Sequence, residues 1–511
     1  MMKVVYIPLD ERPCNTIYPI DAMKLAEGVE VSHPHVNILG NKKTPGNNKE
    51  IKNFLLEETK DADAIILSTE MLVYGGLVPS RLHHLDRERI HEYKSTIEQL
   101  RNRNKDVKIY VSNLIMRTPR YSSNDEEPEY YGEYGEQIFK YGWLKDQSNR
   151  GEIKEEGKIE LEDLAKVIPD EVIEDYEKRR HFNVEVNKAN VELLAENIID
   201  FLVIPQDDAA EFGYTAMDQK EVFKKLKQER LKDVMIYPGA DEVGFTLLAR
   251  AYQEFHDLRL KIYPYYSSTY GPYIIPNYED RPINETLKAH IMASGSELVY
   301  TKEEADIVLA YNTPGKKMQE AWDQFNKNEV TYSSYRHMPT FLNKIKGFLD
   351  DDIPVIIADS AYSNGGDSEL IELLDSNNLY TRLLNYKAWN TNGNTVGSAL
   401  SSGVLAYQSN KKEELLSNLF LHFYEDFIYQ SIVRMDVTEN DLPDLGLNYF
   451  DLKDKKEIVT KIVKDKMLKE AKKYLTQTDE IEKYDIEVDF PWNRMFEVSI
   501  HIRKNENKEV S

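Results

Sequence analysis

Two adjacent aspartates give the clearest chemical signal in the sequence. Asp207 and Asp208 lie in the segment IPQDDAAEFGY (204–214), directly after an apolar run. Two carboxylates in one pocket shift each other's pKa values apart, so that one can donate a proton while the other stays charged. Cleavage of a glycosidic bond uses such a pair. A structural alternative is that Asp208 caps a short helix over 209–213.

Similar polar segments follow other apolar runs. These are LDERPCN (9–15), TEMLVYGGLVPSR (69–81), PGADEVGF (238–245), ADSAYSNGGDSEL (358–370) and KAWNTNGNTVGSAL (387–400). From them and from neighbouring strand ends we predict the substrate-binding residues Asp10, Arg12, Glu70, Tyr74, Arg81, Asn113, Asp241, Glu242, Asn312, Asp359, Asn364, Asp367, Trp389, Asn390 and Asn394. Carboxylates and amides bind hydroxyl groups, and aromatic rings cover C–H faces, so this composition favours a carbohydrate site. Structural alternatives are an ion pair of Arg12 with Asp10 or Glu11, a helix cap at Asp241, and a helix cap at Asp367 or Ser368.

Other catalytic systems lack their motifs. The sequence contains no GxxxxGK[ST], GxSxG or HExxH pattern. Cys14 is the only cysteine, which excludes a disulfide framework and a cysteine-based zinc site. We therefore expect no cofactor and no metal. A carboxylate site for Mg²⁺ or Mn²⁺ is the alternative, because hard cations take oxygen ligands.

The charge balance excludes two classes of partner. The chain has 65 lysines and arginines against 89 aspartates and glutamates, a net charge of −24. Such an acidic chain is repelled by phosphate backbones, so we expect neither nucleic acid nor a membrane as a partner. No apolar run reaches the ~18 residues of a membrane helix. The first residues, MMKVVYIPLDERP, lack the features of a signal peptide, and we expect a cytoplasmic location.

Short apolar runs alternate with helical patterns along most of the chain. Strands are predicted at 3–9, 35–39, 63–68, 107–112, 200–205, 233–237, 259–263, 305–311 and 353–358. Helices are predicted at 86–103, 185–199, 217–231, 244–256, 282–294 and 340–349. This alternation indicates an α/β fold with parallel strands, whose carboxyl ends carry the ligand site. We predict a (β/α) TIM-like barrel with insertions, and the alternative is two doubly wound domains split near residue 257.

Two regions interrupt this rhythm. Residues 114–184 are too long for a simple crossover and are predicted to be an insertion into a catalytic domain that spans 1–409. Residues 410–511 are predicted to be a mainly helical C-terminal region. It contains amphipathic helices at 411–435 and 455–476 and a strand at 496–503.

Six segments together resemble the bacterial family catalogued as domain of unknown function 4127, over essentially the whole chain. They are PLDERPCN (8–15), YGGLVPSR (74–81), QDDAAEFGY (206–214), PGADEVG (238–244), DSAYSNGGD (359–367) and AWNTNGNTVGSAL (388–400). The Asp-Asp pair is also similar, more remotely, to that of O-GlcNAcase-like and hexosaminidase-like barrel glycosidases. That resemblance implies that Asp207 holds the substrate's acetamido group and that Asp208 is the general acid and base. It also implies sugar contacts for Asp10, Arg12, Asp359 and Asn364.

The sequence thus predicts a hydrolase of the glycosidase type, acting on a small glycan or glycoside, N-acetylhexosamine-containing ones included. Two alternatives belong to other classes. One is a divalent-metal-dependent hydrolase or lyase with a carboxylate site, and the other is a two-lobed protein that binds a small molecule without catalysis.

Overall fold

The computed structural model describes residues 1–505, and the chain divides into two compact units. The first unit comprises Met1–Glu11, Gly28–Leu247 and Tyr278–Asp280. The second unit comprises Arg12–Glu27, Leu248–Asn277 and the chain from Arg281 onward.

The first unit contains an open sheet of six parallel strands. In spatial order these are β2 (Val29–Ser32), β1 (Met2–Ile7), β5 (Ala64–Ser68), β6 (Lys108–Ser112), β7 (Phe201–Gln206) and β8 (Val234–Pro238). In chain order this is 2-1-3-4-5-6, the arrangement of flavodoxin-like doubly wound folds. Every residue of β5 and β7 is buried, which explains why their sequences, AIILS and FLVIPQ, lack alternation.

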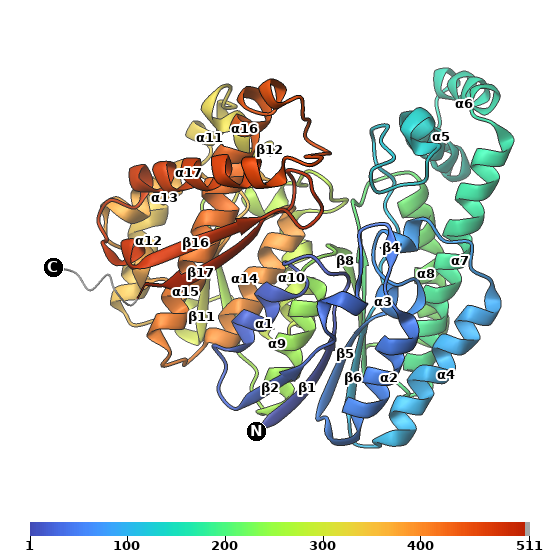
Figure 1. Cartoon of the computed structure of the whole chain (residues 1–511), viewed down its shortest axis with the longest axis horizontal. Helices are drawn as coiled ribbons and strands as arrows, with labels where there is room; N and C mark the ends of the chain where they lie inside the picture. Colours follow the sequence, from blue (N-terminus) through green and yellow to red (C-terminus); the bar gives the residue numbers. More distant parts are fainter. Residues whose placement is uncertain (506–511) are drawn as a thin grey trace. The chain divides into compact units, whose positions relative to one another are not determined.

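Helices cover the first sheet and extend beyond it. They are α2 (Asn48–Glu58), α3 (Thr69–Val73), α4 (Arg87–Arg103), α5 (Tyr131–Arg150), α6 (Glu155–Val167), α7 (Asp170–Ala195) and α8 (Tyr214–Glu229), with a small hairpin of β3 (Gly40–Asn41) and β4 (Thr44–Pro45). Apolar side chains of α2, α4, α7 and α8 share one core with alternate residues of the strands. Figure 1 shows these four helices beside the sheet. The predicted insertion at 114–184 contains α5, α6 and the first half of α7.

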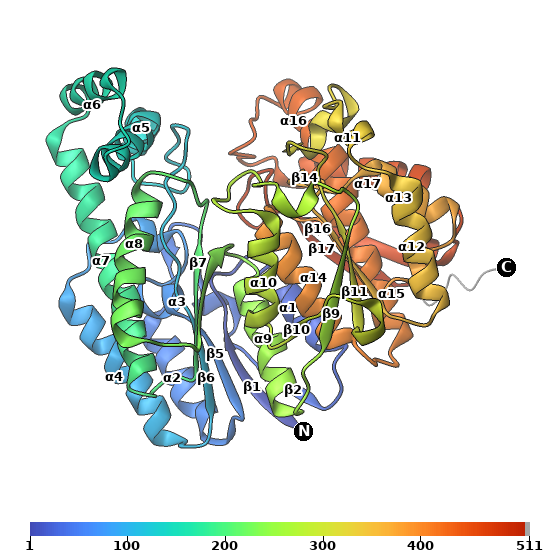
Figure 2. The same cartoon turned by 180° about the vertical axis from the view of Figure 1, so that it is seen from behind.

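The second unit contains an open sheet of five parallel strands. Their spatial order is β10 (Glu297–Leu298), β9 (Lys261–Tyr266), β11 (Ile307–Asn312), β13 (Val355–Asp359) and β15 (Asn385–Lys387). This is again a 2-1-3-4-5 order. Val308 and Ile357 belong to the core on one face, whereas Leu309 and Ile356 belong to the core on the other. Helices therefore pack on both faces of this sheet (Figure 2).

The second unit contains α-helices and a π-helix. They are α1 (Ile17–Met23), α10 (Ile283–Ala293), α11 (Thr331–Ser334), α12 (Met338–Asp350), α13 (Ser368–Ser376), α14 (Asn392–Ala406), α15 (Lys412–His422), a π-helix (Phe423–Val433), α16 (Arg434–Asn440) and α17 (Lys456–Tyr474). Helix α9 (Val243–Phe255) runs from the first unit into the second. Short β12 (Gln319–Glu320) pairs with β14 (Tyr362–Ser363), and β16 (Tyr484–Asp489) forms an antiparallel hairpin with β17 (Ser499–Lys504).

Comparison with the sequence prediction confirms the α/β class with parallel sheets. A single closed barrel is not found among residues 1–505, where the long strands pair into two separate sheets. Their orders correspond to the alternative with two doubly wound sheets. Barrels and doubly wound sheets repeat the same βα unit, so periodicity does not distinguish them. Residues 410–505 lie in the second unit, where Phe420 and Phe427 share a core with Ile357.

One predicted strand is wrong. Residues 35–39 contain a 3₁₀ turn (Val36–Ile38), in which the His35 side chain accepts a hydrogen bond from the backbone N–H of Asn37. The neighbouring strand is Val29–Ser32 instead. Over the described residues, no helix combines the length and the apolar character that crossing a bilayer requires.

Candidate functional site

Five predicted residues meet at the carboxyl edge of the first sheet. A cavity of about 10 Å³ is lined there by Glu70, Tyr74, Leu77, Ser80, Arg81, Asn113, Leu114, Met116, Asn183 and Asp207. This volume admits about one water molecule. The hydroxyl of Tyr74 is buried without a hydrogen-bond partner among the described residues. A larger ligand must therefore bind outside this cavity, over its more exposed members.

Glu70 and Asn113 are held by a buried network. Glu70 Oε1 accepts hydrogen bonds from Asn113 Nδ2 at 2.7 Å and from the backbone N–H of Leu114 at 2.8 Å. Asn113 Oδ1 in turn accepts from Asn187 and Asn190 of α7, at 2.8 and 3.1 Å. Burial raises the pKa of Glu70. These contacts join the ends of β5 and β6 to α7. Glu70 and Asn113 therefore form part of the buried wall of the cavity.

Asp207 is held by a close ion pair with Arg81. Arg81 Nη2 donates to Asp207 Oδ2 at 2.7 Å, and the Arg81 side chain is 2% exposed. Hydrogen bonds from a guanidinium to a carboxylate are among the strong ones in proteins. The Asp207 side chain keeps 13% of its surface exposed. It can therefore contact a ligand that lies over the cavity.

Asp208 differs sharply from its neighbour. Among the described residues its nearest cation is Arg117 Nη1, 3.7 Å from Asp208 Oδ2, and the Asp208 side chain is 27% exposed. Burial and then the negative charge of Asp207 raise the pKa of Asp208 to about 6. Its φ of 44° places it in the left-handed region, which non-glycine residues adopt mainly at functional sites and turns. Helix α8 begins at Tyr214, so Asp208 does not cap a helix over 209–213.

Three charged residues of this site were not predicted. Arg117, Glu126 and Glu127 come from the segment between β6 and α5. Arg81 Nη1 contacts Glu126 at 2.8 Å, and Arg117 Nε contacts Glu127 at 2.9 Å. Arg81 and Arg117 thus lie among four carboxylates, those of Glu126, Glu127, Asp207 and Asp208. The run of three acidic residues, DEE at 125–127, inside the predicted insertion, was the available signal.

The other predicted residues of the first unit are buried at neighbouring strand ends. Asp10 follows β1 and is 2% exposed, and Asp241 follows β8 and is 6% exposed. Glu242 Oε2 accepts a hydrogen bond from the backbone N–H of Ala240 at 2.9 Å, which supports the turn after β8.

In the second unit, predicted residues form a saturated polar network. Asp359 accepts hydrogen bonds from Asn312 at 2.8 Å, Tyr386 at 2.9 Å and the backbone N–H of Asp367 at 2.8 Å. Arg336 Nη1 donates to Asp367 Oδ2 at 2.6 Å. Asp367 also caps the N-terminus of α13, the structural role that was the alternative to ligand binding in the sequence prediction. Burial and then Asp367 raise the pKa of Asp359 to about 7. The oxygens of both aspartates are engaged internally, which suits a structural role.

Three more predicted residues, Asn364, Asn390 and Asn394, form hydrogen bonds within the second unit. Asn364 donates to Glu320 Oε2 at 2.8 Å, and its backbone N–H donates to the carbonyl of Asn390 at 2.9 Å. Asn394 donates to Thr391 Oγ1 at 3.1 Å in the first turn of α14.

Two further predicted residues lie beside other aromatic rings of the second unit. The Trp389 ring lies 6.4 Å from that of Phe496. Arg12 contacts Glu497 at 3.7 Å and lies 4.8 Å from the ring centre of Trp492.

One buried cluster has the composition of a metal site. Potential ligand atoms of His422, Glu425 and Asp426 lie within 4.8 Å of one another at the start of the π-helix. The side chain of Lys387 is buried nearby, and Asp426 and Glu425 interact with it electrostatically. Burial lowers the pKa of Lys387 to about 7. When protonated, this ammonium group opposes the binding of a cation, and it competes for the same two carboxylates.

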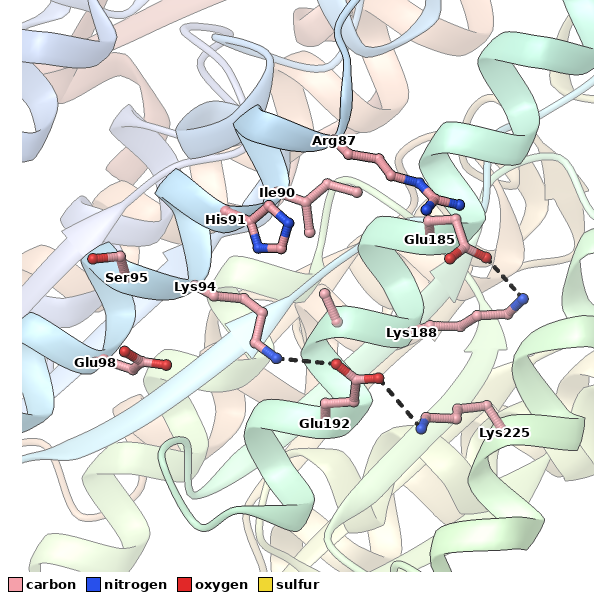
Figure 3. Close-up of a pocket in the computed structure, with 11 residues that line it drawn as sticks. Arg87, Ile90, His91, Lys94, Ser95, Glu98, Glu185, Lys188, Glu192 and Lys225 are labelled. Carbon is pink, nitrogen blue, oxygen red and sulfur yellow. Dashed lines mark hydrogen bonds and ion pairs between the residues drawn. The ribbon is translucent and has the colours of Figure 1, made fainter.

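A larger groove lies on the outer surface of the first unit. It has a volume of about 600 Å³ and is lined by α4, α7 and Lys225 of α8 (Figure 3). Its charges pair with one another: Glu192 contacts Lys94 at 3.0 Å and Lys225 at 3.4 Å. None of the predicted site residues lines this groove. Exposed ion pairs of this kind do not form a catalytic constellation.

Comparison with known proteins identifies one family. A family model described as "Protein of unknown function (DUF4127)" matches residues 4–501, which confirms the resemblance carried by the six segments. A search of curated proteins returns no match.

Proposed function

For this chain, which belongs to the DUF4127 family, we propose glycoside hydrolysis at Asp207 and Asp208. One observation carries the proposal: two adjacent carboxylates have different charged neighbours. Arg81 Nη2 lies 2.7 Å from Asp207 Oδ2, whereas Arg117 Nη1 is 3.7 Å from Asp208 Oδ2, and burial and the charge of Asp207 raise the pKa of Asp208 to about 6. An acid and an anion side by side are the two groups that cleavage of a glycosidic bond requires.

In the proposed reaction, protonated Asp208 donates its proton to the oxygen of the leaving group as the C1–O bond breaks. Asp207 stabilises the positive charge that develops on the sugar ring, or holds the acetamido group where the substrate carries one. Water then adds to C1, and its proton returns to Asp208, which restores the starting state. Arg81 acts through Asp207 by holding its carboxylate in place.

The substrate class follows from the composition around the pair. We propose that a small glycan or glycoside binds outside the cavity, where Asp207 and Asp208 keep part of their surface exposed. The glycan's hydroxyl groups would meet carboxylates, because the two arginines of the site, Arg81 and Arg117, are themselves engaged with these carboxylates. Glu126 adds a third partly exposed acid beside Arg81 and Arg117.

A panel of aryl glycosides that includes N-acetylhexosaminides tests this proposal. Purified full-length protein should release the aryl group from one sugar, and EDTA should not reduce the rate. The D208N variant should lose this activity. Release by D208N at the wild-type rate would refute the assignment, and silence across the panel would favour the two-lobed binding protein.

A second candidate is a divalent-metal-dependent hydrolase, which the cluster of His422, Glu425 and Asp426 favours. It is weaker because Lys387 lies beside the same carboxylates. The candidates give different results in the panel. A metal enzyme loses its activity in EDTA and in the H422A variant, whereas the Asp208 mechanism is insensitive to both.

A further inference from the structure

Arg434 is a buried cation with very few partners. Its side chain belongs to the largest fully buried ones of the chain, and it lies at the end of the π-helix. The guanidinium lies 5.1 Å from the ring centre of Trp322 and 5.3 Å from that of Phe496. Nη1 donates a long hydrogen bond of 3.4 Å to the hydroxyl of Tyr449. Among residues 1–505, no carboxylate forms an ion pair with Arg434.

The two remaining nitrogens mark one edge of the guanidinium. Nε and Nη2 are buried and have no hydrogen-bond partner within the described chain. These two N–H groups point the same way and form the edge that binds a carboxylate or phosphate through two parallel hydrogen bonds. A buried full charge with an unsatisfied edge costs stability unless an anion compensates it. An oxyanion bound to the Nε–Nη2 edge would provide this compensation.

The acids nearby are engaged with other groups. Glu497 contacts Arg494 at 2.5 Å, and Glu320 accepts a hydrogen bond from Asn364 at 2.8 Å. Both acids act on Tyr449 electrostatically, together with Arg434 and Arg494. The negative charges of Glu497 and Glu320 partly offset the positive charge of Arg434, but neither acid binds its Nε–Nη2 edge.

The surroundings suit an organic anion. Trp322, Tyr449 and Phe496 are half-buried, so the aromatic frame of Arg434 reaches the surface of the unit. Gln430, one helical turn before Arg434, has a buried Oε1 with no partner in the described chain. This oxygen can accept a hydrogen bond from a hydroxyl group. Aromatic faces, a hydroxyl acceptor and a guanidinium edge form a set that matches a hydroxylated acid.

We propose that Arg434 is the anchor of a ligand site in the second unit. The ligand is a small oxyanion that offers two oxygens to the Nε–Nη2 edge, and a sugar acid fits the aromatic frame and Gln430 best. The proposal uses residues of the second unit alone and does not depend on glycoside hydrolysis at Asp208.

Calorimetric titration of the full-length protein tests the site with three probes: glucuronate, inorganic phosphate and neutral glucose. We expect saturable binding of glucuronate, and no binding of glucose. R434K keeps the charge and loses the edge, so it should bind at least about tenfold more weakly. The exposed R382M variant is the control and should bind like the wild type. Binding of phosphate alone would identify a phosphate ester as the ligand class. Absence of binding by both anions, or equal binding by R434K, would overturn the proposal.

Thermal unfolding without ligand gives a second, independent readout. If the guanidinium awaits an anion, R434M removes an uncompensated charge and should raise the Tm by about 2 °C or more. Glucuronate should raise the Tm of the wild type and leave that of R434M unchanged. A lower Tm for R434M, combined with no effect of either anion on the wild type, would show that Arg434 is purely structural.

Discussion

Arg81 donates a 2.7 Å hydrogen bond from Nη2 to Oδ2 of Asp207, whereas the cation nearest to the adjacent Asp208 among residues 1–505 is Arg117, 3.7 Å away. Two residues of identical chemistry, joined by one peptide bond, thus have different electrostatic surroundings. The predictions for the first unit follow from this difference.

Asp208→Asn should lower kcat about 100-fold or more, because an amide cannot donate the proton that the leaving group needs. The Tm should change little, since the side chain is partly exposed. Glu211→Gln, an exposed change in the same loop, is the matched control and should keep wild-type turnover. Steady-state kinetics on the substrate found in the panel measures both. A D208N enzyme with near-normal kcat would remove Asp208 from the mechanism.

Asp207→Asn should move the pH profile of its residual activity. Negative charge on Asp207 raises the pKa of Asp208, so its removal lets that pKa fall. The general acid works only when protonated. The decline of activity with rising pH, centred near pH 6 in the wild type, should therefore occur at a lower pH in the variant. Profiles of kcat/KM measured from pH 4 to 8 report the shift, and an unchanged or upward-moving decline contradicts the assignment.

Asp359 should make the protein less stable as pH rises. Its pKa is raised to about 7 in the folded state, from 3.8 for the free side chain. Between these values the folded state binds more protons than the unfolded state, so the free energy of unfolding falls with increasing pH. The fall attributable to Asp359 is on the order of 1 kcal/mol or more between pH 4 and 7.

Urea unfolding at pH 5 and pH 8 measures this effect, with Asp359→Asn for comparison. The variant should lose less stability than the wild type between the two pH values, whatever its absolute stability. Equal losses would show that Asp359 does not titrate in this range.

Arg336→Met should destabilise the protein by about 3–5 kcal/mol, because it leaves Asp367 charged and buried without its partner. Both side chains are almost inaccessible, at 1% and 2% exposure. Arg382→Met is the control, since Arg382 pairs with Asp350 at an exposed position and should contribute at most about 1 kcal/mol. Urea denaturation compares the two variants, and a loss of less than about 1 kcal/mol in R336M would contradict a structural role for this pair.

The sequence by itself determined which segments form strands and helices and placed the candidate site residues at the carboxyl ends of the strands. Continuous apolar runs such as FLVIPQ predict strands that are buried on both faces, and periods of 3.6 residues predict the helices between them. Ligand sites of parallel sheets lie at the carboxyl ends of strands, so Glu70, Asn113 and Asp207 could be placed together before any coordinates. The family membership was likewise readable from short motifs.

Only the tertiary structure decided how strands are ordered and which polar groups are satisfied. Strand order depends on long-range pairing, which leaves no trace in local periodicity, so barrel and doubly wound sheets looked alike. Burial and partners distinguish residues of one type: Asp359 accepts hydrogen bonds from donors of its own unit, whereas the cation nearest to Asp208 within residues 1–505 is 3.7 Å away. The unsatisfied edge of Arg434 could not be predicted from the sequence either. The rings beside it belong to Trp322 and Phe496, which are far from Arg434 in the sequence.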